Sequence, residues 1–261
     1  MKFLFKAGGT LLDTAESRDM LARQIAAVSG VHEVVVVHGG GKQMTRFLAE
    51  RGIESRFVNG LRVTSPDVLD GVIKVLAGSV NHELVGSLNR AGARAVGISG
   101  IDALLVEAEP MDPDLGAVGR VARAHPELLE LLVKHGYLPV VACVAGDRQG
   151  RFYNVNADQM AVACAAAFGA RELVFLTDVA GVLDGAGQVR SVLTASESEQ
   201  LITRGVATGG MQAKLNAAIA ALRQGVAEVR IAPGAADRVI ERLLAGEPLG
   251  TRLVASEVHA L

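Results

Sequence analysis

The amino-acid sequence predicts an α/β fold, a three-layer αβα sandwich with a mainly parallel central sheet. Two observations lead to this prediction. Short apolar or β-branched runs alternate along the chain with longer amphipathic stretches, which is the order expected of strands joined by crossover helices. The chain has 261 residues, 50% hydrophobic and 21% charged, so it can bury a large core in one unit or two close lobes.

Six short runs rich in β-branched and apolar residues are the strand candidates. Right-handed crossovers between parallel strands place the loops that follow them along one edge of the sheet, where ligands of such sheets bind. In chain order, the expected strands are Lys2 to Phe5, Glu33 to Val37, Ala95 to Ile98, Leu138 to Ala142, Leu173 to Leu176 and Glu228 to Ile231.

The longer stretches between the strands are the helix candidates. Two regions, Arg56 to Thr64 and Leu104 to Asn154, depart from simple alternation because turn residues separate short strand-like pieces, so we expect hairpins or lids there. A soft boundary is expected near Ala170, within one continuous sheet. The expected helices are Ser17 to Val28, Lys42 to Arg51, Asp67 to Arg90, Pro126 to His135, Asp158 to Phe168, Met211 to Gln224 and Asp237 to Leu244.

Bulk composition argues against several classes of function. The net charge is -2, the pI is near 6.3 and only 3% of the residues are aromatic. The chain therefore lacks the excess of basic residues that binds nucleic acid or an anionic membrane, and has few aromatic rings on which bases could stack. No apolar run reaches membrane-spanning length, and no signal-peptide core follows Met1. Cys143 and Cys164 lie in apolar strings without metal-ligand spacing, so we interpret them as buried small hydrophobes. These features predict a cytoplasmic protein.

The placement of the lysines indicates phosphate chemistry. Only six of the 26 basic residues are lysines, and two of them, Lys6 and Lys214, lie in glycine-flanked and otherwise uncharged surroundings. A compact ammonium group beside a glycine turn is suited to phosphate oxygens. These two lysines therefore suggest phosphoryl transfer.

Two glycine turns follow the first two expected strands, Gly8-Gly9 after one and His38-Gly39-Gly40-Gly41 after the other. Bare backbone there can approach a phosphoryl group, and the helix that follows favours an anion at its N-terminus. The alternative for a single pair is a purely structural role, because glycine also permits tight turns. Neither turn is a Walker A loop or a G-x-G-x-x-G fingerprint, so a Rossmann-type oxidoreductase loses its main support.

Three short polar side chains precede an alanine-rich expected helix. Asn154, Asn156 and Asp158 alternate along the chain, so they can point into one cleft and bind polar groups of a substrate. The alternative is that Asn156 or Asp158 simply caps the helix.

Two further segments favour small-molecule binding. Arg62 follows a turn in an apolar setting, where it can bind a carboxylate or simply remain solvated. Asp178 and a glycine turn follow an expected strand. This pattern is suitable for nucleotide contacts, although an ordinary loop would look much the same.

Taken together, these segments form one ordered set: Lys6 with Gly8-Gly9, His38 to Gly41, Asn59 to Thr64, Asn154 to Asp158, Asp178 to Leu183, and Gly210-Met211 with Lys214. The set resembles the acetylglutamate kinases, the arginine-pathway branch of the amino acid kinase family. The resemblance covers essentially the whole chain. Its glycine turns are typical of the superfamily, whereas the Arg62 and Asn154 to Asp158 segments together are fairly specific to this branch.

The resemblance implies the amino acid kinase fold and a function for each part of the chain. Residues 1–170 would bind the acidic amino acid and form a homodimer, and residues 171–261 would bind ATP. Lys6 and Lys214 would stabilise the transferring phosphoryl group, while Asp158 would hold both lysines. Phosphate would be bound by backbone donors at Gly8, Gly9, Gly40 and Gly41. The substrate would be bound by Gly40, Gly41, Arg62, Asn154 and Asn156. ATP would be bound by Asp178, Val179, Ala180, Gly181, Val182, Leu183, Val206, Ala207, Thr208, Gly210 and Met211.

The implied reaction is the phosphorylation of the γ-carboxylate of N-acetyl-L-glutamate by ATP, the second step of arginine biosynthesis. The nucleotide would carry Mg2+, and the protein would hold no metal of its own. The carboxylate is ionised at neutral pH and is already a nucleophile, so no general base is needed. Two alternatives remain: a sister kinase acting on N-succinylglutamate or on acetylated or carrier-linked aminoadipate, and a catalytically silent nucleotide-sensing protein.

Some positions depart from the usual family pattern. Ala7 stands where relatives usually carry a larger residue, Ala103 replaces a glycine common after Asp102, and Arg120 occupies a place that is usually acidic. Arginine-inhibited members also carry an extra N-terminal helix, whereas here only Met1 precedes the first strand. We therefore expect a homodimer without strong inhibition by arginine.

Overall fold

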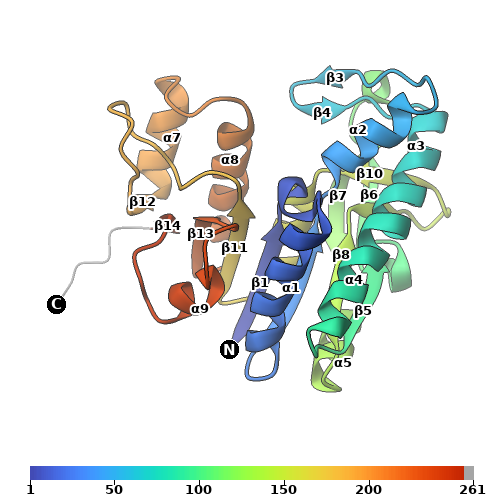
Figure 1. Ribbon diagram of the computed structural model, residues 1–261. Helices are drawn as coiled ribbons and strands as arrows, with labels where there is room; N and C mark the ends of the chain where they lie inside the picture. Colours follow the sequence, from blue (N-terminus) through green and yellow to red (C-terminus); the bar gives the residue numbers. More distant parts are fainter. Residues whose placement is uncertain (256–261) are drawn as a thin grey trace.

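The computed structural model describes residues 1–255, which fold into the expected α/β sandwich around one large sheet (Figure 1). All six strands predicted from the sequence are present, with ends within two residues of those expected. They are β1 (Lys2–Ala7), β2 (Glu33–His38), β5 (Ala95–Ser99), β8 (Leu138–Ala142), β11 (Glu172–Thr177) and β13 (Glu228–Pro233).

Two further strands, β12 (Val192–Thr194) and β14 (Thr251–Val254), complete an eight-stranded sheet in the order β12-β14-β13-β11-β1-β2-β8-β5. Neighbouring strands run parallel except β13 and β14, which are antiparallel. Because β1 pairs with β2 on one side and with β11 on the other, the sheet is continuous across Ala170. The division of labour between residues 1–170 and 171–261 stays a prediction, and residues 256–261 lie outside the described part.

Every predicted helix is also present, and α7 is an addition to the predicted set. No helix among residues 1–255 has the length and apolar character needed to cross a membrane. The helices are α1 (Ala15–Ser29), α2 (Gly41–Ala49), α3 (Pro66–Val72), α4 (Asn81–Arg90), α5 (Glu127–Lys134), α6 (Ala157–Phe168), α7 (Ala195–Thr203), α8 (Gly209–Arg223) and α9 (Val239–Leu244), with 3-10 turns η1 (Gly9–Leu12), η3 (Asp102–Leu104) and η4 (Pro113–Leu115).

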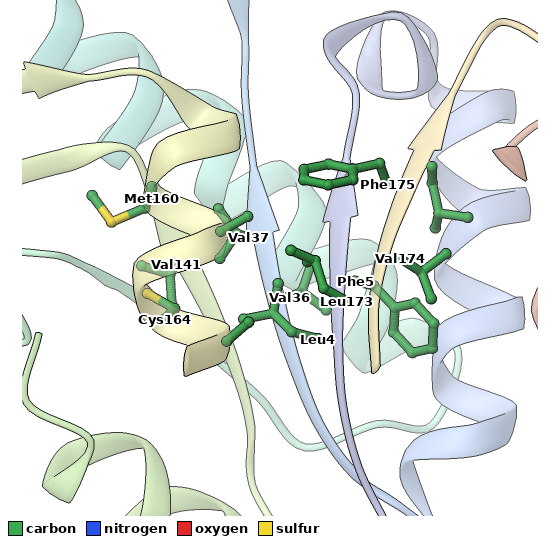
Figure 2. Close-up of a cluster of buried hydrophobic side chains, with 14 of the residues drawn as sticks. Leu4, Phe5, Val36, Val37, Val141, Met160, Cys164, Leu173, Val174 and Phe175 are labelled. Carbon is green, nitrogen blue, oxygen red and sulfur yellow. The ribbon is translucent and has the colours of Figure 1, made fainter. Parts of the chain in front are cut away.

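The main core lies between the sheet and the helices on its two faces. On one face α1 contacts α4 and α9, whereas on the other α6 packs against β1, β2, β11 and α8. In Figure 2 the strand residues Val37 and Val141 lie next to Met160 and Cys164 of α6. The alanine-rich sequence of α6 allows this helix to approach the sheet closely, and most of its residues are buried. This close packing brings the N-terminus of α6 to the carboxyl end of β1.

The two regions expected to form hairpins or lids do so. β3 (Phe57–Val58) and β4 (Leu61–Arg62) form a hairpin whose Asn59-Gly60 turn has both φ angles positive, 49° and 78°, as a two-residue turn of type I′ requires. Further along the chain, β6 (Val106–Pro110), β7 (Val118–Ala124), β9 (Val144–Gly146) and β10 (Phe152–Val155) close into a small barrel.

The long helix expected from Asp67 to Arg90 is continuous but not uniform. It begins at Ser65, whose Oγ accepts the Val68 N–H at 3.4 Å, and continues through α3. Its middle part, η2 (Ile73–Val80), is π-helical, and α4 follows directly. π-helical turns recur at functional sites, and η2 contacts the second glycine turn, as described below.

Ala103 adopts a left-handed conformation, with φ 51° and ψ 25°. A Cβ atom is unfavourable there, whereas glycine has no such penalty, so the departure from the family pattern has an energetic cost. We expect Ala103→Gly to raise the free energy of unfolding by about 0.5–1 kcal/mol, or Tm by about 1–3 °C. The matched control is Ala220→Gly in the last turn of α8, where the backbone is helical and glycine should lower stability. A loss of stability in both variants would contradict strain at Ala103.

Candidate active site

The two glycine turns lie side by side at the carboxyl ends of β1 and β2. Gly9 is so close to the second turn that a Cβ atom on it would lie 3.4 Å from the Gly41 nitrogen. A Cβ atom on Gly40 would lie 2.5 Å from Leu76 Cδ2 in η2, so the Leu76 side chain would have to shift to make room for it. The structure thus brings together the glycines that the sequence predicts to bind one phosphoryl group.

The backbone N–H groups of these glycines are not equivalent. Gly8 donates its N–H to the Leu176 carbonyl at 3.0 Å and is thereby part of the sheet. Among residues 1–255, the N–H groups of Gly9, Gly40 and Gly41 enter no backbone hydrogen bond. Gly41 is also the first residue of α2, where the helix dipole favours an anion. The second turn therefore offers most of the free donors.

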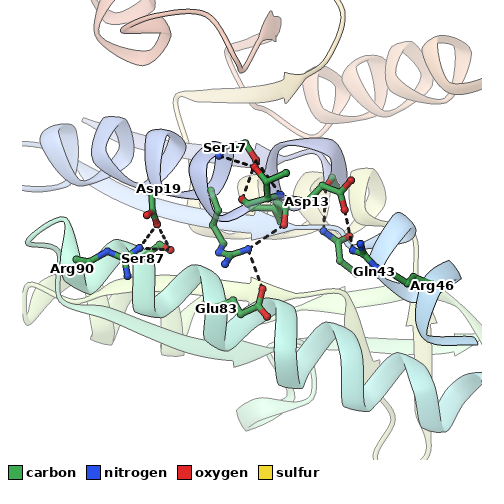
Figure 3. A network of polar contacts seen from close by, with 12 residues as sticks. Asp13, Ser17, Asp19, Gln43, Arg46, Glu83, Ser87 and Arg90 are labelled. Carbon is green, nitrogen blue, oxygen red and sulfur yellow. Dashed lines mark hydrogen bonds and ion pairs between the residues drawn. The ribbon is translucent and has the colours of Figure 1, made fainter. Parts of the chain in front are cut away.

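Polar side chains connect the segments around these turns (Figure 3). Asp13, just after η1, accepts a hydrogen bond from Arg46 of α2 at 3.0 Å, and the Gln43 amide donates to the Gly9 carbonyl at 3.4 Å. In the following helix, α1, Asp19 accepts a hydrogen bond from Ser87 of α4 at 2.7 Å. The Asp13–Arg46 pair is exposed and contributes little alone, but together the three contacts connect α2 and α4 to the segments around the first turn.

A buried carboxylate lies between two lysines from distant segments. Lys6 Nζ, from β1, is 2.7 Å from Asp158 Oδ1, and Lys214 Nζ, from α8, is 3.6 Å from Asp158 Oδ2. The side chains of Lys6 and Asp158 are each 8% exposed, whereas that of Lys214 is 20% exposed. The three residues predicted to be catalytic therefore form one cluster.

The cluster carries a net positive charge. Burial opposes ionisation of Asp158, but the charges of Lys6 and Lys214 outweigh it and hold the pKa of the carboxyl below its ordinary value. Two ammonium groups thus face one carboxylate in a site of low dielectric. Such an arrangement suits the stabilisation of negative charge on a transferring group.

A cavity of about 240 Å³ lies beside this cluster. It is bounded by both glycine turns, the β3-β4 hairpin, η2 and the N-terminus of α6, and much of its wall is apolar, including Phe57, Leu76 and Val118. Of the residues predicted to form the site, it is lined by Lys6, Gly9, Gly40, Gly41, Arg62, Asn154 and Asn156. One space therefore connects the lysine cluster with Arg62.

Arg62 is a buried cation in the wall of this cavity, only 8% exposed. Its hydrogen bonds go to neutral oxygens, those of Ser55, Thr45 and the Gly41 carbonyl, and burial lowers the pKa of its guanidinium. A buried cation that is held by neutral groups favours an anionic ligand. This arrangement agrees with a carboxylate-binding role rather than a solvated arginine.

The two asparagines differ in role. Asn156 caps α6, because its Oδ1 accepts the Asp158 N–H at 2.9 Å and the Gln159 N–H at 3.3 Å. Asp158 is not the cap and pairs with the lysines. Asn154 Nδ2 donates to Thr64 Oγ1 at 3.0 Å. Both asparagines nevertheless line the cavity.

His38 and Asn81 support the second turn, a role that the sequence does not predict. His38 Nδ1 lies 2.9 Å from the Gly39 carbonyl, and Nε2 lies 3.0 Å from Asn81 Nδ2. Burial lowers the pKa of His38 to about 4, so the ring is neutral, donates from Nδ1 and accepts at Nε2. Cys143, expected to be a buried small hydrophobe, is buried but also lines the cavity and donates to the His38 carbonyl at 2.9 Å.

The residues expected to bind ATP lie outside this cavity, after β11 and before and at the start of α8. Gly181 has a φ of 156°, and the adjacent Val182 N–H donates to Thr251 Oγ1 at 2.8 Å, which fixes the loop. Val179, Leu183 and Val206 expose apolar side chains there. Nucleotide binding by Asp178 to Leu183, Val206 to Thr208, Gly210 and Met211 stays a prediction.

The chain resembles proteins of known type over nearly its whole length. The model of the amino acid kinase family matches residues 1–233. An acetylglutamate kinase from Solibacter usitatus (strain Ellin6076) is 70% identical over 255 residues, which cover 97% of this chain and 99% of the relative. Another, from Acidobacterium capsulatum, is 42% identical and covers 98% of this chain and 100% of the relative.

Solved structures show the same fold. N-acetylglutamate synthase from Neisseria gonorrhoeae, complexed with coenzyme A and N-acetyl-glutamate, matches with a TM-score of 0.87 at 25% identity, covering 98% of this chain and 60% of that chain. The protein smu.665 from Streptococcus mutans UA159 matches with a TM-score of 0.84 at 29% identity, covering 98% and 99% of the two chains.

The charge of Asp158 should be a large term in stability, because its removal leaves Lys6 buried without a partner. We expect Asp158→Asn to lower the free energy of unfolding by about 3 kcal/mol in urea titrations at pH 7. A lowered pKa means that the stabilisation is present above the ordinary aspartate value and is lost only as pH falls through the lowered one. The difference should therefore be the same at pH 5.5, and a clear decrease there would contradict a lowered pKa.

Proposed function

The chain belongs to the amino acid kinase family, and we propose that it is an acetylglutamate kinase. It phosphorylates the γ-carboxylate of N-acetyl-L-glutamate with ATP, the second step of arginine biosynthesis. The names of its relatives support this function, and the observation that carries it is the Lys6–Asp158–Lys214 cluster beside a cavity that contains Arg62. The cluster suits a phosphoryl group, and Arg62 suits the acid that receives it.

The reaction needs no proton transfer. A γ-carboxylate oxygen attacks the γ-phosphorus of ATP, the bond to the β-phosphate oxygen breaks, and ADP leaves with the electron pair. Lys6 and Lys214 balance the charge that spreads over the transferring group, while Asp158 holds the two ammonium groups close together despite their repulsion. The free N–H groups of Gly9, Gly40 and Gly41 supply further donors beside them.

The finer assignments rest on the family resemblance, and the positions of Arg62, Asn154 and Asn156 in the cavity wall support three of them. Arg62 binds the α-carboxylate, Asn154 and Asn156 bind the polar groups of the acetylated amino acid, and the loops at Asp178 and Val206 bind the nucleotide. ATP brings Mg2+ on its phosphates, where the ion neutralises charge when bound. Binding of the ion by the nucleotide, rather than by Asp158, fits the site because both oxygens of Asp158 already face lysines.

The cellular setting is also part of the proposal. The protein acts in the cytoplasm as a homodimer, in keeping with the family resemblance and with two buried free cysteines. Sedimentation equilibrium tests the dimer, because a monomer or hexamer would give a clearly different mass.

The proposed function is tested by trapping the acyl phosphate with hydroxylamine in the presence of ATP and Mg2+. Hydroxamate formation is compared for N-acetylglutamate, N-succinylglutamate, N-acetylaminoadipate and free glutamate. We expect a clear preference for N-acetylglutamate. Preference for another acid would keep the mechanism but move the protein to a sister pathway, and no product with any acid, together with tight ATP binding, would favour a silent nucleotide sensor.

The two lysines should be needed for the chemical step. We expect Lys6→Ala and Lys214→Ala each to lower kcat by about 100-fold or more, because each removes a charge that stabilises the transition state. The fold should persist, as checked by circular dichroism. Lys74→Ala is the matched control, since this lysine is exposed and forms its ion pair with Asp70, away from the cluster. Near-normal turnover in Lys214→Ala would exclude its role.

A further inference from the structure

Groups of the protein itself hold the guanidinium of Arg62 from several sides. Its Nη1 donates to Ser55 Oγ, and its Nη2 donates to Thr45 Oγ1 at 2.8 Å and to the Gly41 carbonyl at 3.1 Å. The ring of Phe57 lies 4.6 Å from the guanidinium carbon. These contacts restrict both the position and the rotation of a side chain that otherwise has several free torsions.

The oxygens that hold Arg62 are all neutral. The Thr45 hydroxyl donates its own hydrogen to the Gly41 carbonyl at 2.9 Å, so a lone pair is available to accept from Arg62. Ser55 is likewise an acceptor toward the guanidinium. A carboxylate in either place would orient the arginine equally well, but it would also cancel most of its charge. Hydroxyls orient it and leave the charge for a ligand.

The same contacts link Arg62 to the phosphate side of the site. Thr45 lies in α2, one turn after Gly41, and Gly41 belongs to the glycine turn that contacts Gly9. Ser55 lies before the β3-β4 hairpin that carries Arg62. The arginine is therefore fixed relative to α2 rather than moving with the hairpin alone. Its distance from the phosphoryl-binding turn determines which carboxylate spacing fits between them.

We propose that Thr45 and Ser55 are positioning residues that fix the Arg62 guanidinium toward the carboxylate of the substrate while leaving its charge uncompensated. Neither hydroxyl needs to touch the substrate. The proposal rests on the proposed function in one respect, that Arg62 binds the substrate acid.

The first test is steady-state kinetics of Thr45→Val and Ser55→Ala. Each should raise KM for N-acetylglutamate about tenfold, with less than about a twofold change in kcat or in KM for ATP. Thr45→Ser keeps the hydroxyl and should restore the KM of the wild type. A fall in kcat with an unchanged KM would overturn the proposal.

If Thr45 acts only through Arg62, the effects of Thr45→Val and Arg62→Ala on KM should not add. In an Arg62→Ala background, Thr45→Val should cause no further rise in KM, because its effect passes through the arginine. An equal rise in both backgrounds would show that Thr45 acts on the substrate itself or only on folding, and would contradict a positioning role.

A measurement without substrate separates this proposal from the proposed function. In 15N NMR spectra of the arginine side chains, the Arg62 Nη groups of the wild type should show slowed rotation, assigned by comparison with Arg62→Ala. Thr45→Val should speed the rotation of Nη2, and Ser55→Ala that of Nη1, because each removes a hydroxyl acceptor of that group. Fast rotation already present in the wild type would refute the positioning role, whereas lack of turnover with N-acetylglutamate would refute only the proposed function.

Discussion

The interaction on which the rest of the site depends is the contact of the Asp158 carboxylate with two lysines. Two ammonium groups that both serve one phosphoryl group must lie a few ångströms apart, where they repel each other strongly in a dry site. A carboxylate between them removes most of that repulsion and still leaves a net positive charge. Its burial is tolerable only because both of its oxygens face cations.

The fold explains why these groups meet although they are distant in sequence. The carboxyl half of β1 lies beside the start of α6, which follows β10 of the small barrel, and beside the first turns of α8, which follows α7. The alanine-rich surface of α6 brings Asp158 down to Lys6, and Asn156 caps the helix so that its first turn is fixed. Thus a packing requirement and a capping residue place one carboxylate accurately.

The cations of the site have two kinds of partner: a carboxylate holds the lysines, and neutral oxygens hold Arg62. The lysines act as a pair, and a carboxylate holds them because their combined charge exceeds what one anion cancels. Arg62 is held by hydroxyl and carbonyl oxygens instead, whereas a carboxylate would cancel most of the charge that we propose binds the substrate. This difference agrees with a substrate that presents two anionic ends, one to be bound and one to react.

Much of this could be predicted from the sequence, and the misses have physical reasons. The strands and most helices follow from periodicity, and Lys6, Lys214, Arg62 and the glycine turns stand out because of their local surroundings. β12 and β14 are too short to give a pattern, although Thr194 and Glu197 form a capping box that could have revealed α7. The supporting roles of Thr45, Ser55 and His38 depend on contacts across the fold, which no local signal encodes.

In the proposed mechanism, the lysine cluster stabilises the transferring phosphoryl group more than it stabilises the bound substrates. The most direct measurement is calorimetric binding of N-acetylglutamate in the presence of ADP and Mg2+, with and without aluminium fluoride as a mimic of the transferring group. We expect aluminium fluoride to tighten binding by about 100-fold in the wild type and to have little effect in Lys214→Ala. An equal gain in both proteins would contradict the claim.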